Sequence, residues 1–149
     1  MKPLLILAGL LVGLSAPAVA QQKPAAKAKP KPAAGAIPAA VLAAGKTVYV
    51  QNCLTCHQAD GGGVDGMNAP LIKTSYVLGD KTRLVNVLLH GMQGVDIEGE
   101  SYNNVMPAFD QLSDQQLANV LTYIRNSFGN KASQVTPAEV KAIRATSKQ

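Results

Sequence analysis

The stretch "NCLTCHQ" (residues 52–58) decides how this chain is interpreted, because it contains both cysteines and one of the two histidines. Three kinds of site use these residue types. A C-x-x-C pair can form a redox-active disulfide, cysteines combined with histidines can bind zinc, and C-x-x-C-H can attach a covalent cofactor. The remainder of the sequence distinguishes among the three.

The first 20 residues, "MKPLLILAGLLVGLSAPAVA", predict a cleaved secretory signal peptide over residues 1–20. Lys2 supplies a charged start, an apolar run covers residues 4–14, and Ala18-Val19-Ala20 is typical of a cleavage site. An uncleaved membrane anchor is the alternative interpretation, but Pro17 and the small residues around it favour processing. We therefore expect an exported protein with no stable membrane insertion once the signal is cleaved.

Residues 21–40, "QQKPAAKAKPKPAAGAIPAA", predict a Pro/Ala/Lys-rich linker, because they offer no periodic apolar face that could bury a core. This segment and the signal also explain the net charge of +5. Five of the 14 Lys and Arg residues lie before residue 41, so nine remain to face nine Asp and Glu. The folded part is formally neutral, and no nucleic-acid partner is expected.

Residues 41–149 have the length of one small domain, with a periodicity that is helical throughout. The domain has no tryptophan and only two phenylalanines, so its core would be marginal without a large apolar cofactor. Helices are predicted over residues 39–52, 80–91, 113–129 and 136–145. Two glycine-rich connections, 58–79 and 91–112, are long enough to suggest that they wrap or bind something. The predicted fold class is all-α, with four to five helices.

Residues at the helix ends support these boundaries. Asp80 is expected to cap the helix that follows it, and Ser113 with Gln116 has the spacing of a capping box. Thr136 and Glu139 have the same spacing at the start of a short C-terminal helix. This last helix lies beyond the core of the domain.

Zinc and thiol chemistry both fit "NCLTCHQ" poorly. Cys53, Cys56, His57 and His90 are the bare minimum for a tetrahedral zinc site, and adjacent Cys56 and His57 are an awkward way to supply two ligands. A C-x-x-C redox centre belongs in a βαβ context, which this helical pattern lacks, and it does not need the histidine.

C-x-x-C-H is the attachment signature of c-type haem, and this interpretation uses all three residues. Cys53 and Cys56 lie one helical turn apart, so both sulfurs can reach the vinyl groups at one edge of a porphyrin. His57 follows on the same face and can serve as the proximal iron ligand. Export agrees with this, since such haem is attached outside the cytoplasm. One covalent haem c is predicted.

The sixth iron ligand determines the function, and Met67, His90, Met92 and Met106 are the candidates. Met106 is favoured because it lies late in the second long connection, just before Pro107 and a helix. A His/Met pair raises the reduction potential and fills both axial positions. The cofactor-binding set is therefore Cys53, Cys56, His57 and Met106, and an electron carrier is expected rather than an enzyme.

The chain resembles the class I monohaem cytochromes c over about residues 43–127. Gly45 and Tyr49 match the family's first helix, which the resemblance implies crosses the last core helix near Tyr123. "NAPL" (68–71) looks like the family's post-motif segment, which implies that the Pro70 carbonyl accepts a hydrogen bond from His57. "MPAF" (106–109) matches the distal methionine segment.

The resemblance is strongest to cytochrome c domains that accompany bacterial periplasmic oxidoreductases. It implies a periplasmic location and partners such as a quinoprotein dehydrogenase, a reductase or a terminal oxidase. Two functional alternatives stay open: a cytochrome subunit bound tightly to such an enzyme, and a haem enzyme or sensor with an open sixth position. The helix at 136–145 departs from the shortest family members, and its role is unassigned.

Overall fold

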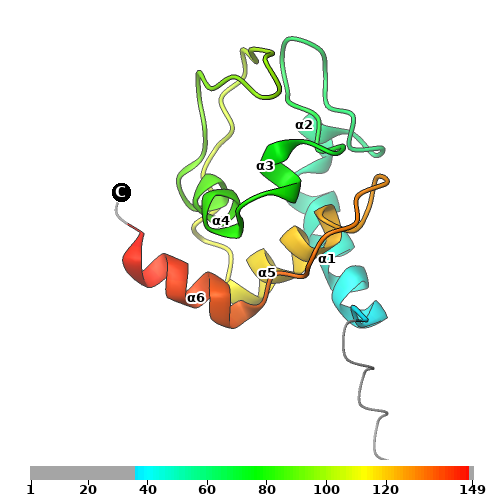
Figure 1. Cartoon of the computed structure of the whole chain (residues 1–149), viewed down its shortest axis with the longest axis vertical. Coiled ribbons are helices and arrows are strands. Elements are labelled where there is room, and N and C mark those ends of the chain that lie inside the picture. The colour runs from blue at the N-terminus through cyan, green and yellow to red at the C-terminus, as the bar shows by residue number, and fades with distance from the viewer. Residues whose placement is uncertain (1–35, 148–149) are drawn as a thin grey trace, which may run out of the picture. The chain divides into compact units, whose positions relative to one another are not determined.

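A computed structural model describes residues 36–147 of the chain. The signal-peptide prediction (1–20) and most of the linker prediction (21–40) lie outside the described residues. The described part has six helices and no strand (Figure 1), and none of these helices is long and apolar enough to cross a membrane. The helices are α1 (Ala39–Asn52), α2 (Leu54–His57), α3 (Ser75–Leu78), α4 (Lys81–His90), α5 (Asp114–Ile124) and α6 (Pro137–Thr146).

The all-α prediction is confirmed, but the expected four to five helices become six within residues 36–147. The two additional helices, α2 and α3, have four residues each. One turn is too short to show an apolar period, so periodicity could not reveal them. A local signal for α3 was present in Thr74, whose hydroxyl accepts a hydrogen bond from the Val77 amide.

The helix starts follow the predicted capping residues. The Asp80 carboxylate accepts a hydrogen bond from the Thr82 amide at the start of α4. Ser113 with Gln116, and Thr136 with Glu139, each form a complete capping box. In each box the hydroxyl and the N3 side chain satisfy amides that have no partner within the helix.

The sequence predicted that helix α5 ends at Gly129, but α5 ends at Ile124. The buried side chain of Asn130 donates a hydrogen bond of 2.9 Å to the Ile124 carbonyl, one of the last carbonyls of the helix. Phe128 and Gly129 both have positive φ, which turns the chain back toward the helix. The Asn130 side-chain amide therefore donates the hydrogen bond that a backbone amide of the next helical turn would otherwise donate to Ile124.

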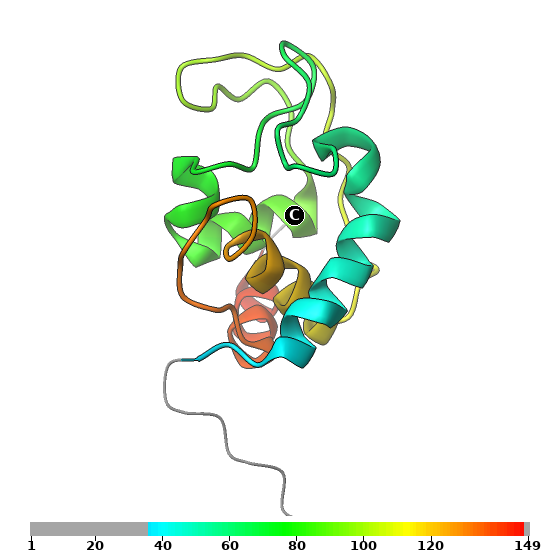
Figure 2. The same ribbon diagram turned by 90° about the vertical axis from the view of Figure 1, so that its right-hand side faces the viewer.

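Helices α1 and α5 cross at a glycine, and this crossing forms the centre of the domain (Figure 2). A Cβ atom on Gly45 would lie 2.1 Å from the Asn119 carbonyl oxygen and 2.6 Å from Cβ of Tyr123. The ring centroids of Tyr49 and Tyr123 lie 5.5 Å apart, and Phe128 completes a cluster with both. The predicted crossing of the first and last core helices is confirmed.

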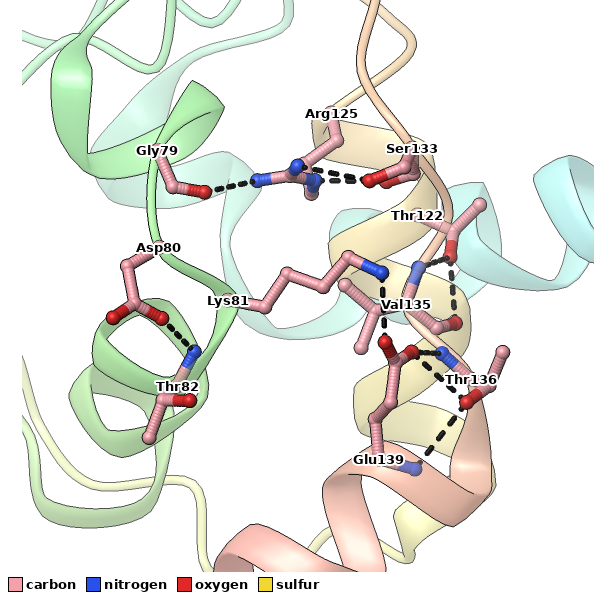
Figure 3. A network of polar contacts seen from close by, with 10 residues as sticks. All are labelled: Gly79, Asp80, Lys81, Thr82, Thr122, Arg125, Ser133, Val135, Thr136 and Glu139. Atoms are coloured by element: carbon pink, nitrogen blue, oxygen red, sulfur yellow. Dashed lines mark hydrogen bonds and ion pairs between the residues drawn. The ribbon is translucent and has the colours of Figure 1, made fainter.

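The C-terminal helix α6 packs against α4 and α5, and polar contacts join it to them (Figure 3). The hydroxyl of Thr122 on α5 donates to the Val135 carbonyl and accepts from the Val135 amide, both at 3.0 Å. Lys81 on α4 forms an ion pair of 2.8 Å with Glu139 on α6. This helix therefore extends the core, which gives it a structural role that its sequence had left unassigned.

Arg125 ties the segment before α4 to the segment before α6 (Figure 3). Its buried guanidinium donates to the carbonyls of Val77 (2.6 Å), Gly79 (3.2 Å) and Ser133 (2.9 Å). Burial lowers the pKa of this guanidinium. Carbonyl oxygens supply the hydrogen bonds that a buried cation needs in place of water.

The two long connections lie together at the end of the domain away from α6 (Figures 1 and 2). The amides of Asn103 and Asn104 donate to the carbonyls of Gly66 and Met67, each at 3.0 Å. These hydrogen bonds join the first connection to the second. Together with the helices below them, the two connections enclose a pocket.

Candidate haem site

The pocket brings together all four residues of the predicted site. Cys53, Cys56 and His57 line it from α2 and the residue before α2, and Met106 lines it from the second connection. Most of the remaining walls are apolar, including Leu71, Leu84, Leu88, Val120, Leu121 and Ile124.

The "NCLTCHQ" stretch forms one tight helical turn at the end of α1. The His57 amide donates to the Cys53 carbonyl at 2.9 Å, which sets the two residues one turn apart. The Tyr49 hydroxyl donates to the Gln58 carbonyl at 2.6 Å and fixes the end of this turn against α1. Cys53 and Cys56 are free thiols. The turn therefore presents two thiols and an imidazole to one pocket.

The His57 ring is oriented by a backbone carbonyl. Its Nδ1 lies 2.9 Å from the Ala69 carbonyl oxygen, so an Nδ1–H donor leaves Nε2 available as a ligand atom. Burial lowers the pKa of His57, and the hydrogen bond to Ala69 opposes this effect. The neutral imidazole is the form that binds iron.

The predicted hydrogen bond from His57 to the Pro70 carbonyl is wrong by one residue. The acceptor is the carbonyl of Ala69, which belongs to the peptide bond that joins Ala69 to Pro70. A residue before proline is biased toward extended backbone, which turns its carbonyl away from helical positions. The segment "NAPL" was therefore identified correctly, but the carbonyl that accepts the hydrogen bond belongs to Ala69, the residue before the proline.

The environment of Cys53 opposes a role in thiol redox chemistry. Burial raises the pKa of Cys53 to about 11, and the neighbouring Cys56 adds to the effect. Reactive C-x-x-C centres need a lowered pKa, because the thiolate is the nucleophile. A buried thiol of high pKa is better suited to a structural or tethering role.

The zinc interpretation finds no ligand set within residues 36–147. No group of three or more His, Cys, Asp or Glu side chains in this part of the chain is placed to hold a metal ion. His90, the fourth possible zinc ligand, does not line the pocket. Its Nε2 instead contacts the hydroxyl of Ser147, at the end of α6.

Met106 is held by the end of α4. Met92 and Met106 exchange two backbone hydrogen bonds, of 3.0 and 2.9 Å, and the Phe109 amide donates to the Leu88 carbonyl at 2.7 Å. These three hydrogen bonds attach the predicted distal segment to α4. The side chain of Met106 is partly buried against the core, whereas Met67 is largely exposed at 47%.

Met92 is a stronger alternative to Met106 as the sixth iron ligand than the sequence suggested. Residues paired directly across an antiparallel bridge have side chains on the same face, and both methionines line the pocket. The sequence placed Met92 only at the end of a helix. Comparing variants at these two positions therefore separates the candidates.

Gly91 is required for this attachment, which leads to a first prediction. Its φ is +74°, and a Cβ atom would lie 2.4 Å from the Met106 carbonyl oxygen. We expect Gly91→Ala to destabilise the protein by about 2–4 kcal/mol, combining left-handed backbone strain with overpacking. Urea unfolding measures this change. The visible spectrum should also change, because the distal segment must move.

Gly94→Ala is the matched control for that substitution. Gly94 has a similar φ of +63°, but a Cβ atom there would have no neighbour within 4 Å. This variant should lose only the strain contribution of about 1–2 kcal/mol and keep the wild-type spectrum. Equal losses of stability and identical spectra in both variants would contradict the assigned role of Gly91.

The residues present fit a c-type haem. Two free thiols one turn apart, a neutral imidazole with its Nδ1 already engaged, and a thioether all face one apolar pocket. These are the donor types that attach and ligate such a haem. A haem in this apolar pocket would also supply the core that a domain with so few aromatic residues lacks.

This combination of an all-α fold and a C-x-x-C-H pocket defines a cytochrome c domain. The family profile described as Cytochrome c matches residues 42–128. Cytochrome c-552 of Thermus thermophilus is 39% identical over 112 residues, which cover 68% of this chain and 84% of that protein. The chain belongs to the cytochrome c family, whose members carry haem and transfer electrons.

Other relatives are named as subunits of larger enzymes. The cytochrome c subunit of a quinone alcohol dehydrogenase from Gluconacetobacter polyoxogenes is 41% identical over 105 residues, covering 68% of this chain but 22% of that protein. The CcoP subunit of a cbb3-type cytochrome c oxidase from Azospirillum is 38% identical over 98 residues, covering 60% of this chain and 30% of that protein. The chain thus matches only a minor part of these relatives.

Proposed function

We propose that this chain is a periplasmic one-electron carrier with a single haem c. Cys53 and Cys56 form its thioether bonds, and His57 and Met106 are its axial ligands. The observation that carries the proposal is the convergence of these four side chains on one apolar pocket. The hydrogen bond between His57 Nδ1 and the Ala69 carbonyl supports it, because that contact leaves Nε2 to face the iron.

The haem supplies reversible one-electron chemistry at iron, and the protein residues control its surroundings. The Ala69 carbonyl fixes the His57 ring, and the Met92–Met106 pair holds the distal segment against α4. Apolar walls such as Leu88 and Leu121 exclude water from the pocket. Because backbone contacts already hold His57 and the Met106 segment, these two residues would need little rearrangement when a bound haem gains or loses an electron.

The proposed partners are periplasmic redox enzymes: a quinoprotein dehydrogenase, a reductase or a terminal oxidase. The support comes from relatives named as subunits of alcohol, gluconate and fructose dehydrogenases and of a cbb3-type oxidase. The same names favour the second candidate, a cytochrome stably bound to such an enzyme. Co-purification with a large enzyme at physiological salt would select the bound form over the free carrier.

Replacing Met106 tests the axial assignment. Wild-type ferric protein should be low-spin, with the weak far-red absorption of methionine bound to Fe(III). Met106→Ala should lose essentially all of this band and lower the reduction potential, because a thioether ligand favours Fe(II). Both changes are measured by visible spectroscopy with a redox titration.

Met92→Ala is the control, because Met92 lines the same pocket and pairs with Met106. We expect it to keep the far-red band. Loss of the band in Met92→Ala with retention in Met106→Ala would transfer the ligand role to Met92. A five-coordinate or high-spin wild-type protein would instead indicate a haem enzyme or sensor.

A further inference from the structure

The formal neutrality of the folded domain conceals a separation of charge. No Lys or Arg lies between Lys46 and Lys73, or between Arg83 and Arg125. These two spans include residues 58–72 of the first connection and all of the second, and Lys73 is the one basic residue that either connection contains. The acidic residues of the connections are all exposed: Asp60, Asp65, Asp96, Glu98, Glu100 and Asp110. The end of the domain around the pocket is therefore acidic.

Exposed apolar side chains gather on the same two connections. Within residues 36–147, four of the five large exposed hydrophobic residues lie there: Met67 (47% exposed), Ile72 (39%), Val95 (38%) and Val105 (57%). Met67, Val95 and Val105 also line the pocket. A bound haem would cover part of these pocket-lining side chains, and the apolar area that it leaves uncovered would lie at the edge of the pocket, where exposed apolar side chains are typical of a binding surface.

The acidic and apolar residues are neighbours along the two connections, which hydrogen bonds join to each other. Asp65 precedes Gly66, whose carbonyl accepts the hydrogen bond that joins the first connection to the second. Asp96 lies between Val95 and Ile97, and both of these line the pocket. We call the set Asp65, Asp96, Glu100, Met67, Val95 and Val105 the acidic mouth.

No cation within the described residues neutralises the acidic mouth. The ion pairs found in this part of the chain join Lys81 to Glu139 and Arg144 to Asp114, on the helices. Glu98 is left out of the set because Arg83 lies close enough to help lower its pKa, after its hydrogen bonds with Ser75. Asp65, Asp96 and Glu100 are exposed and form no ion pair within the described residues, although the Asp96 carboxylate accepts a hydrogen bond from the Ser101 hydroxyl.

We propose that the acidic mouth is the docking surface for a redox partner that has a basic patch around its own electron-exchange site. An apolar centre with a charged rim is the usual arrangement of a transient interface, and opposite charge accelerates encounter. In each encounter one electron passes from the reduced protein to the oxidised one, and no atom is transferred. The inference rests on the proposed function, because the haem must occupy this pocket.

Small charged oxidants provide the test. Reduced holoprotein is mixed in a stopped-flow instrument with the cation tris(phenanthroline)cobalt(III) or with the anion ferricyanide, over a range of NaCl concentrations. Oxidation by the cation should slow as salt rises, and oxidation by ferricyanide should accelerate, because salt screens attraction and repulsion alike. Opposite signs, or no salt dependence with either oxidant, would overturn the proposal.

Variants with matched charge assign the effect to the acidic mouth. Asp96→Asn should slow the cation at low salt by about twofold or more, and adding Asp65→Asn and Glu100→Gln should remove most of the salt dependence. Asp114→Asn on α5 changes the net charge by the same amount as Asp96→Asn. An equal effect of Asp114→Asn would mean that net charge alone acts, and the proposal would fail.

A measurement that does not depend on haem separates this inference from the proposed function. Decalysine is titrated into the purified full-length mature chain, and amide chemical shifts are recorded by NMR. Shift changes should be confined to residues 58–72 and 91–112 and should be absent in the triple variant. Shift changes elsewhere would overturn the docking surface whether or not haem is bound. A colourless protein with the expected shifts would overturn the proposed function and with it the redox role of this surface, leaving only a surface that binds a basic partner.

The chain's own lysines provide the last control. Removing the lysine-rich segment 21–35 should leave the cation rates within about twofold of wild type. A large rise in these rates after its removal would show that this segment occupies the acidic mouth in place of a partner.

Discussion

Replacing both Cys53 and Cys56 with serine should give a protein that retains almost no haem and loses most of its stability. The thioether bonds keep the cofactor at a very high effective concentration beside His57. A ligand present at a thousand times its Kd stabilises a fold by about 4 kcal/mol, and a tethered haem should contribute at least this much. Without it, the apolar walls of the pocket would be open to water.

The measurement combines acidified-acetone extraction with urea unfolding followed by circular dichroism. Wild-type haem should remain with the protein after extraction, and the haem of the double variant should be removed. The single variants Cys53→Ser and Cys56→Ser serve as controls, since each keeps one thiol for attachment. A double variant with wild-type haem retention and an unchanged urea midpoint would refute covalent attachment at this motif.

Replacing Gly45 with alanine should be the most damaging single-methyl change in the helical core. In an exposed helix, glycine to alanine stabilises by about 0.5–1 kcal/mol. Here the sign should reverse, because the new Cβ would lie 2.1 Å from the Asn119 carbonyl oxygen, which belongs to the backbone of α5. The two helices must separate, so we expect a loss of about 3 kcal/mol or more, at the upper end of overpacking costs.

Ala43 lies on an exposed position of the same helix and provides the control. Ala43→Gly should cost only about 0.5–1 kcal/mol, from helix propensity alone. Urea unfolding of both variants measures the difference. If Gly45→Ala were neutral or stabilising, the close crossing of α1 and α5 would be incorrect.

The parts of the fold that were predicted well are those specified by local signals. The apolar periods of α4 and α5 extend over two to three turns, and the capping residues of α4, α5 and α6 lie within three positions of the amides they satisfy. The end of α5 was missed because Asn130, six residues beyond Ile124, supplies the hydrogen bond that ends the helix. That contact depends on tertiary folding, which no window of sequence reveals.

The site shows the same division between local and non-local information. The C-x-x-C-H spacing is local, and it led directly to the turn that presents Cys53, Cys56 and His57 to the pocket. The pairing of Met92 with Met106 joins residues fourteen positions apart, so the rivalry between them emerged only in three dimensions. The acidic mouth was missed for a related reason. The sequence analysis used the net charge of the whole domain, which is zero, whereas docking depends on how the charged residues are distributed over the surface.

The most direct test of the central claim is the mass of the tryptic peptide that contains "NCLTCHQ". Trypsin cleavage after Lys46 and Lys73 releases residues 47–73, which contain both cysteines. The protein is purified from a host that attaches c-type haem. This account predicts a peptide heavier by one haem, with Cys53 and Cys56 both bonded to the cofactor and resistant to alkylation. A peptide of unmodified mass, with two alkylatable thiols or a disulfide, would contradict it.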